Sequence, residues 1–176
     1  MTAELTPITA TVTLVVSTNT YVTLAEADAY MAQVLYADAW TAAATDTRNR
    51  ALVTACRDLA KVTYKHRKTD PDQTLDFPRA ITSYLYTDDW QFVHATYDDT
   101  IIPQVVKDAQ CDEALALLTG GGNDRVSLQA QGVTSITLGK LTEVYGSSRT
   151  GGLVSHDAYV RLLPWIAGSV RIARFR

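Results

Sequence analysis

The sequence contains little cysteine and few histidines, and each shortage argues against a class of function. Its 176 residues include two cysteines, Cys56 and Cys111, both within predicted helices on or near apolar faces. We expect two reduced core thiols, and a disulfide between them is the alternative. The two cysteines therefore give no indication of a redox function. The three histidines lie in separate segments without a neighbour at metal-ligand spacing, so the sequence predicts no zinc site.

Long apolar runs, phosphate-binding loops and nucleophile motifs are missing as well. No apolar run approaches the roughly 20 residues that span a bilayer, and the N-terminus lacks the basic start of a secretion signal. We therefore expect a soluble protein made in the cytoplasm, with no membrane partner. Gly120 to Gly122 follow a predicted helix instead of preceding one, and no Ser or Cys stands in a nucleophile elbow. The residues predict no catalytic group, no metal ligand and no cofactor.

Charge is present but unevenly distributed. The formal net charge is -3, yet residues 147–176 carry five arginines against one aspartate, which is +4 and leaves -7 for the rest. The end of the chain is basic and the body is acidic. At this length, with 47% hydrophobic residues, the chain can bury one adequate core, so we expect a single domain over residues 1–176.

The most completely specified segment is a helix within Ile101 to Gly122. Pro103 suits the first helical turn, and Gly120 to Gly122 favour the helix end, giving about four turns. Its apolar surface is broader than a single stripe, which predicts a central, mostly covered helix. The residues of that surface are Val105, Val106, Ala109, Ala114, Leu115, Leu117 and Leu118.

A first outer helix is predicted from its cap. Thr23 and Glu26 stand at capping-box spacing, so a helix should run from Leu24 to about Leu35. Tyr30 and Leu35 are expected to face inward.

Two more helices are predicted from the residues at their starts. Trp40 is expected to fill the gap between helices, and Asp46 opens a helix that should end near Tyr64. Ser155 can cap a last helix that includes Tyr159, Leu162, Leu163 and Trp165, although Pro164 should kink or end it. The residues expected to face inward from the middle helix are Leu52, Cys56, Leu59 and Thr63.

Three stretches between the helices have unusual compositions. Residues 57–68 hold five basic side chains against one acid, which fits either a nucleic-acid patch or a solvated helix end. Residues 70–80, DPDQTLDFPRA, are predicted to form a loop anchored to the core by Leu75 and Phe77. Residues 81–100 are aromatic and acidic, which suits a contact surface or an insertion because the acids would repel phosphate.

Strand-like patterns complete the chain. Residues 1–19 are predicted to form an N-terminal β arm, and residues 132–146 a hairpin that turns at Gly139-Lys140. Residues 167–176 form an extended basic C-terminal arm. The predicted fold is therefore mainly α: a helical bundle over residues 20–166 with a small β-hairpin and extended N- and C-terminal arms.

The hairpin carries more apolar residues on its alternating positions than a free hairpin can leave in water. It is predicted to contact a neighbouring subunit or the next ring. The residues expected to make this contact are Ile136, Leu138 and Leu141.

Laid end to end, these segments resemble a phage head-to-tail connector family, the adaptor or head-completion proteins, often labelled DnaT-like single-stranded DNA-binding proteins. The resemblance covers most of the chain and is most specific at DPDQTLDFPR. It also includes TYVTLAEADAY, RALVTACRDL, IPQVVKDAQCDEALALL and the strand pair around Ile136 to Tyr145. The aromatic and acidic stretch and the arginine-rich end depart from the family pattern.

The resemblance implies a ring, usually dodecameric, at the head-to-tail junction of the virion, assembled in the host cytoplasm. It implies four partners: the portal protein, a tail or terminator/nozzle protein, further copies of the same chain, and the genomic double-stranded DNA in the channel. It implies no catalysis, so we expect a protein that is not an enzyme.

On this interpretation the C-terminal arm, Ser169 to Arg176, docks on the portal by adding a strand to one of its sheet edges. The apolar side chains of the arm fix the register of this strand, and its arginines bind carboxylates of the portal. The alternative is that the arginines face the channel and contact DNA phosphates. The residues predicted to bind the portal are Val170, Arg171, Ile172, Arg174, Phe175 and Arg176.

Two other functions remain open. A single-stranded DNA-binding replication accessory would need aromatic side chains stacked among basic groups, whereas the aromatic stretch of this chain is acidic. An enzyme or metal-binding domain is the third hypothesis.

Overall fold

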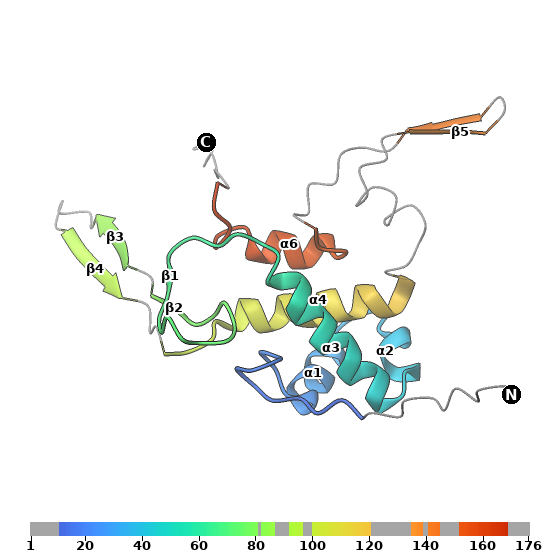
Figure 1. The fold of residues 1–176 in the computed structure, drawn as a ribbon, viewed down its shortest axis with the longest axis horizontal. Helices are drawn as coiled ribbons and strands as arrows, with labels where there is room; N and C mark the ends of the chain where they lie inside the picture. Colours follow the sequence, from blue (N-terminus) through green and yellow to red (C-terminus); the bar gives the residue numbers. More distant parts are fainter. Residues whose placement is uncertain are drawn as a thin grey trace, which may run out of the picture.

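A computed structural model describes residues 11–80, 82–86, 92–96, 100–120, 135–138, 141–144 and 152–168. At its centre lies helix α4, Gln104–Gly120, against which the other helices pack (Figure 1). The mainly α fold and the central helix are confirmed. The surrounding helices are α1 (Leu24–Met31), α2 (Asp38–Ala42), α3 (Thr45–Leu59) and α6 (His156–Leu162).

The ends of α4 follow the predicted proline and glycine positions with small corrections. Pro103 lies just before the helix, where its carbonyl accepts hydrogen bonds from the N–H groups of Val106 and Lys107. Gly120 is the last residue and has a φ of 138°, which side-chain-bearing residues rarely adopt. Gly121 and Gly122 lie outside the described residues. Val105, predicted to be part of the covered surface, is 39% exposed, whereas its neighbour Val106 is buried in the core.

The buried side chains form two clusters, one on each half of α4. The first, which we call the N-half core, joins the N-terminal half of α4 to α6 and the end of α3. It contains Tyr21, Cys56, Leu59, Val62, Tyr64, Phe77, Val106, Ala109, Leu153, Ala158, Leu162 and Ile166. The second, the C-half core, joins the C-terminal half of α4 to α1, α2 and the middle of α3. It contains Val22, Ala27, Met31, Trp40, Ala51, Leu52, Ala55, Cys111 and Ala114. The two cysteines are buried free thiols, as predicted.

Helix α1 begins as predicted and ends early. The Thr23 side chain accepts from the Glu26 amide, and the Glu26 side chain accepts from the Thr23 amide, so the capping box is formed. The helix stops at Met31, and Leu35, predicted to face inward, is 76% exposed. Trp40 explains the early stop: its ring is buried and its indole N–H donates to Asp28 of α1 at 2.8 Å, so the chain must turn back before another helical turn.

Helix α3 also ends before the predicted position. It stops at Leu59 instead of near Tyr64, and Thr63, predicted to face inward, is exposed. The next segment is instead extended, because the Ala167 amide donates to the Thr63 carbonyl at 2.9 Å and Tyr64 forms an antiparallel bridge with Ile166. Tertiary pairing therefore replaces the last helical turn.

The N-terminal segment is not a strand over the residues that the structure describes. Residues 11–15 have no regular structure, and Val16 makes only an isolated bridge with Thr20. The segment is held by α3 side chains: the Val12 amide donates to Asp46 and the Val12 carbonyl accepts from Asn49, each at 2.9 Å. Side chains at the start of α3 thus replace the sheet partner that a β arm would need.

Helix α6 begins at the predicted cap but ends before Leu163 and Trp165, which the predicted helix included. The Ser155 hydroxyl accepts from the Ala158 amide at 3.1 Å, and the helix ends at Leu162, just before Pro164. The chain beyond it reaches Gly168 in the described structure, and residues 169–176 lie outside it.

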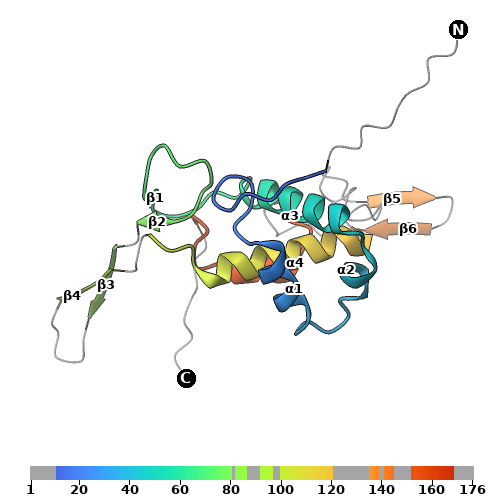
Figure 2. The ribbon, with the colours of Figure 1, turned by 90° about the horizontal axis from the view of Figure 1, so that it is seen from below.

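Three antiparallel hairpins accompany the helices. Strands β1 (Arg67–Lys68) and β2 (Arg79–Ala80) close the loop after α3. Strands β5 (Ser135–Leu138) and β6 (Leu141–Val144) pair Leu138 with Leu141, so the predicted hairpin with its two-residue turn is confirmed. Strands β3 (Thr82–Tyr86) and β4 (Phe92–Thr96) form a further hairpin that the sequence analysis did not predict. Figures 1 and 2 show the β3–β4 and β5–β6 hairpins projecting from opposite ends of the helical body.

None of the helices that the structure describes combines the length and the apolar character needed to cross a membrane.

Candidate functional site

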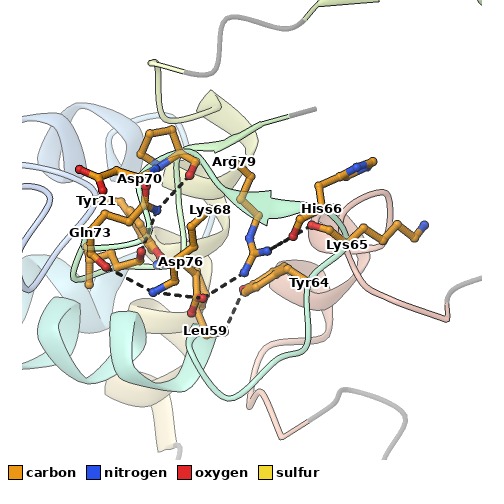
Figure 3. A network of polar contacts seen from close by, with 12 residues as sticks. Tyr21, Leu59, Tyr64, Lys65, His66, Lys68, Asp70, Gln73, Asp76 and Arg79 are labelled. Carbon is orange, nitrogen blue, oxygen red and sulfur yellow. Dashed lines mark hydrogen bonds and ion pairs between the residues drawn. The ribbon is translucent and has the colours of Figure 1, made fainter. Parts of the chain in front are cut away.

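A polar network orders the loop that follows α3, which contains the most specific motif of the sequence (Figure 3). The side chain of Gln73 organises the loop: its Oε1 accepts from the Asp70 amide at 3.2 Å, and its Nε2 donates to the carbonyls of Leu75 at 2.9 Å and Pro78 at 3.0 Å. The Asp72 amide donates to Asp70 Oδ1 at 2.9 Å, which closes a turn at the start of the motif. The side chains of Asp70 and Gln73 therefore hydrogen-bond to backbone groups of their own loop.

Arg79 ties this loop back to the segment after α3. Its Nη2 donates to Asp76 Oδ1 at 3.1 Å, and its Nη1 donates to the carbonyls of Lys65, at 3.3 Å, and His66. Lys68 Nζ lies 3.9 Å from the same carboxylate oxygen of Asp76. Since the Arg79 side chain is only 9% exposed, its guanidinium is committed to these internal acceptors.

Aromatic rings surround the same arginine. Phe77, 1% exposed, packs edge-on against Tyr21, Tyr64 and Trp165 with ring centroids 6.1, 4.9 and 5.3 Å away. The Arg79 guanidinium lies 5.2 Å from the Tyr64 ring centroid and 5.7 Å from that of Phe77. The prediction that Phe77 anchors the loop is confirmed. The basic and aromatic groups of this region therefore contact one another within the N-half core.

Two tyrosine hydroxyls extend the network inward. The Tyr64 hydroxyl donates to the Leu59 carbonyl at 2.8 Å, which caps the end of α3, and the Tyr21 hydroxyl accepts from the Asp76 amide at 3.1 Å. Burial raises the pKa of both tyrosines far above the ordinary value, so both hydroxyls stay protonated at physiological pH.

A second polar network joins α1, α4 and α6. The Tyr30 hydroxyl donates to Asp112 Oδ1 at 2.7 Å, while Arg161 Nε donates to Asp112 Oδ2 at 2.6 Å. Arg161 also donates to the Tyr30 hydroxyl at 3.0 Å, and Lys107 Nζ lies 2.7 Å from Glu26 Oε1. These contacts fix the orientation of the outer helices on α4.

Two fully buried polar side chains of α4 have structural roles that the sequence analysis missed. Gln110 Oε1 accepts from the Tyr21 amide at 2.8 Å, and its Nε2 donates to the Thr20 hydroxyl at 2.9 Å and to the Leu52 carbonyl at 2.8 Å. Gln110 therefore joins α4 to α3 and to the segment before α1.

The second buried side chain is Glu113. Its two carboxylate oxygens accept from the amides of Val154 and Ser155, each at 2.8 Å, at the start of α6. Burial raises the pKa of Glu113, while the two backbone hydrogen bonds act in the opposite direction. Neither Gln110 nor Glu113 has a sequence pattern that reveals its partners, because those partners lie in distant segments.

The described residues offer no activated nucleophile or metal site. Burial raises the pKa of both Cys56 and Cys111 to about 12, so both thiols are protonated at neutral pH. Within the described ranges, no group of three or more His, Cys, Asp or Glu side chains is placed to hold a metal ion.

The basic stretch of residues 57–68 divides between interior and surface. Tyr64 is buried, whereas the side chains of Arg57, Lys61 and Arg67 are exposed, and Lys61 is paired with Asp58 at 2.5 Å. The interpretation as a solvated helix end holds for Arg57 in the last turn of α3 and not for residues 61–68, which follow the end of the helix.

The residues predicted to contact partners are placed only in part. Ile136 pairs with Glu143 and Leu138 with Leu141 in the β5–β6 hairpin, and the surroundings of these side chains lie outside the description. The predicted portal-binding residues also lie outside the described structure: Val170, Arg171, Ile172, Arg174, Phe175 and Arg176. The described structure therefore gathers Ile136, Leu138 and Leu141 in one hairpin.

Comparison with known proteins gives one match. The profile of a family described as "Putative DnaT-like ssDNA binding protein" matches residues 8–174, which is nearly the whole chain. No curated protein and no solved structure matches.

Proposed function

The chain belongs to the DnaT-like ssDNA-binding protein family, and from its fold and its resemblance to phage connector proteins we propose that it is a structural virion protein. It forms an adaptor ring at the head-to-tail junction, between the portal protein and a tail or terminator/nozzle protein. Twelve copies surround a channel for the genomic double-stranded DNA, a ring size taken from the usual dodecamer of connector proteins. On this proposal the protein is not an enzyme.

The observation that carries the proposal is the pair of hairpins that project from the helical body. The β3–β4 and β5–β6 hairpins extend from opposite ends of the body in both views (Figures 1 and 2). A two-stranded hairpin alone in water is marginally stable at best, so hairpins of this kind gain their stability by packing on another surface. In a ring, a neighbouring subunit or the adjacent ring supplies that surface.

The interior of the body favours a structural role as well. The aromatic and basic groups around Phe77 and Arg79 are engaged with one another, and the polar side chains of α4 bond to the backbone of neighbouring segments. These groups stabilise a rigid subunit. Residues 165–167 pair with residues 63–65, and we assign portal docking to residues 169–176, which follow them in the sequence.

Co-purification tests this proposal. The tagged protein mixed with the portal protein of the same phage should elute with it as a complex of defined stoichiometry. Separate elution of the two proteins at micromolar concentrations would contradict the adaptor function.

The family description favours a second candidate, a single-stranded DNA-binding accessory protein of replication. The exposed Arg57 and Arg67 offer phosphate contacts. Within residues 11–80, 100–120 and 152–168, however, Tyr36 is the one exposed aromatic, so these ranges offer no row of rings on which bases stack.

A gel shift near physiological salt separates the two candidates. The adaptor function predicts weak binding to single-stranded DNA without sequence preference, because nonspecific dissociation constants at that salt are about 10⁻⁴ to 10⁻⁶ M. Submicromolar binding that an Arg57→Ala, Arg67→Ala variant loses would favour the replication accessory. The control for surface substitution in the same region is Asp72→Ala with Thr74→Ala, at two exposed side chains that offer no positive charge to a phosphate.

A further inference from the structure

The end of α3 and the segment after it present a surface that carries positive charge and no exposed acid. We call this surface, formed by the exposed residues from Arg57 to Arg67, the basic strip. The one acid in the range, Asp58, is 8% exposed, and its carboxylate lies 2.5 Å from Lys61 Nζ. Glu113, which interacts electrostatically with Asp58 and Lys61, is fully buried. The exposed residues of the strip are Arg57, Ala60, Lys61, Thr63, His66 and Arg67.

The arginines of the strip differ from the other basic residues of the body in their pairing. Among the described residues, every lysine and arginine outside residues 57–67 lies within 3.9 Å of a carboxylate oxygen. In contrast, Arg57 and Arg67 are exposed and form no ion pair within the described ranges. Their charges are therefore open to an anionic partner. The paired residues are Arg48, Arg50, Lys68, Arg79, Lys107 and Arg161.

The acids that follow the strip in the sequence belong to the next loop. Asp70 and Asp72 are exposed at the start of that loop, and Asp76 forms ion pairs within its polar network. Figure 3 shows the side chains of Lys65 and His66 pointing away from Asp70 and Asp76. The strip therefore ends where the loop begins.

The absence of exposed rings in the strip distinguishes between the two forms of DNA. Tyr64, the one aromatic residue from Arg57 to Arg67, is 7% exposed, and its ring packs against Phe77 and Arg79. Proteins that bind single strands gain affinity by stacking bases on exposed rings. A duplex keeps its bases stacked inside and offers its phosphates, which arginine binds in bidentate geometry. A basic surface without open rings therefore suits the backbone of duplex DNA.

We propose that the basic strip binds the phosphate backbone of duplex DNA, with Arg57 and Arg67 making the contacts. This inference rests on the proposed ring, whose channel brings duplex DNA to the subunit, and it names the surface that faces this DNA. The contact is independent of base sequence, because phosphates carry no sequence information. Two arginines in each copy bind weakly enough that the DNA can slide past them.

Two double variants that remove the same charge test this contact. The strip variant is Arg57→Gln with Arg67→Gln. The control is Arg50→Gln with Arg161→Gln, which removes two arginines that are 55% and 41% exposed but lie against carboxylates. Circular dichroism and thermal melting check that both variants stay folded.

Fluorescence anisotropy of a labelled duplex over a series of salt concentrations gives the readout. The logarithm of the binding constant falls linearly with the logarithm of the salt concentration, with a slope of about -0.9 for each phosphate neutralised. The slope of the strip variant should therefore be smaller in magnitude than that of wild type by about 1.8, whereas the control should keep the wild-type slope. A labelled single strand of the same sequence should bind no more tightly than the duplex, because the strip has no ring on which bases can stack.

Three results would overturn the inference: no binding of the duplex by wild type at the lowest salt concentration, a strip variant whose slope matches that of wild type or of the control, or tighter binding of the single strand than of the duplex. The portal mixture tests the adaptor function separately, so failure of the strip and failure of the ring are distinguishable.

Discussion

At the scale of single residues, Phe77 contributes most to the order of the loop after α3. Its ring is 1% exposed and contacts three other rings. Phe77→Ala should therefore lower the free energy of unfolding by about 3–5 kcal/mol, as measured by urea denaturation. Leu75→Ala, at a half-buried position of the same loop, should lower it by less. An unchanged unfolding curve for Phe77→Ala would mean that the loop is not anchored by this ring.

The second residue-scale prediction concerns Glu26. The side-chain hydrogen bond from Lys107, followed by the backbone bond from Thr23, lowers the pKa of Glu26 to about 2. Since the folded pKa lies below the ordinary 4.5, the charged form stabilises the fold above about pH 4.5, and this contribution is lost as the pH falls toward 2.

The variant Glu26→Gln isolates this charge, because glutamine preserves the capping box. It should be less stable than wild type at pH 7 by about 1 kcal/mol or less, since the Glu26 side chain is 45% exposed. The difference should shrink between pH 4.5 and pH 2 in urea denaturation series. A difference that does not vary with pH would show that the ion pair with Lys107 is not its cause.

Individual residues also show where sequence reasoning fails. Trp40 and Phe77 could be predicted as core residues because large rings between predicted helices are rarely left in water. The inward orientation of Leu35 was wrong, since it assumed a helix that continues past Met31. The roles of Gln110 and Glu113 depend on backbone groups in distant segments, which no local pattern reveals.

At the scale of elements, the β5–β6 hairpin carries a prediction about assembly. The double substitution Ile136→Asp with Leu138→Asp should leave the subunit helical and abolish ring formation, because it places charge on the predicted contact face. Ser135 and Thr137 alternate with these residues and are exposed, so Ser135→Asp with Thr137→Asp is the matched control and should still assemble. Circular dichroism and size-exclusion chromatography measure both effects. Intact rings from the first variant would place this contact elsewhere.

The C-terminal arm carries the second element-scale prediction. Deleting residues 169–176 leaves every residue of both cores in place, so the truncated protein should unfold at the same denaturant concentration as the full chain. It should fail to co-purify with the portal. If it binds the portal as well as the full chain does, the docking assignment is wrong and an arm that faces DNA or the tail is the better explanation.

Helix starts could be predicted from the sequence, whereas helix ends often could not. The caps at Thr23 and Ser155 are local hydrogen bonds between residues three positions apart. The end of α3 at Leu59 depends on pairing between residues 63–65 and 165–167, a contact between distant segments. The β3–β4 hairpin was not predicted, because the aromatic and acidic composition of residues 81–100 was interpreted as a contact surface or an insertion and not as paired strands.

At the scale of the whole molecule, the mainly α fold around a central helix could be predicted because the apolar surface of α4 is too broad for one neighbour. The division into two cores, one on each half of that helix, could not be predicted, because it depends on which outer helix reaches which half. This division gives the two halves of α4 different packing partners, namely α6 and the end of α3 on one half and α1, α2 and the middle of α3 on the other.

Electron microscopy of the purified protein, alone and mixed with its portal, tests the central claim most directly. The account predicts a closed ring of this protein stacked on the portal, coaxial with its channel, with the hairpins in contact with neighbouring subunits. A portal that remains bare in the presence of excess protein, or density at a site away from the channel axis, would contradict it.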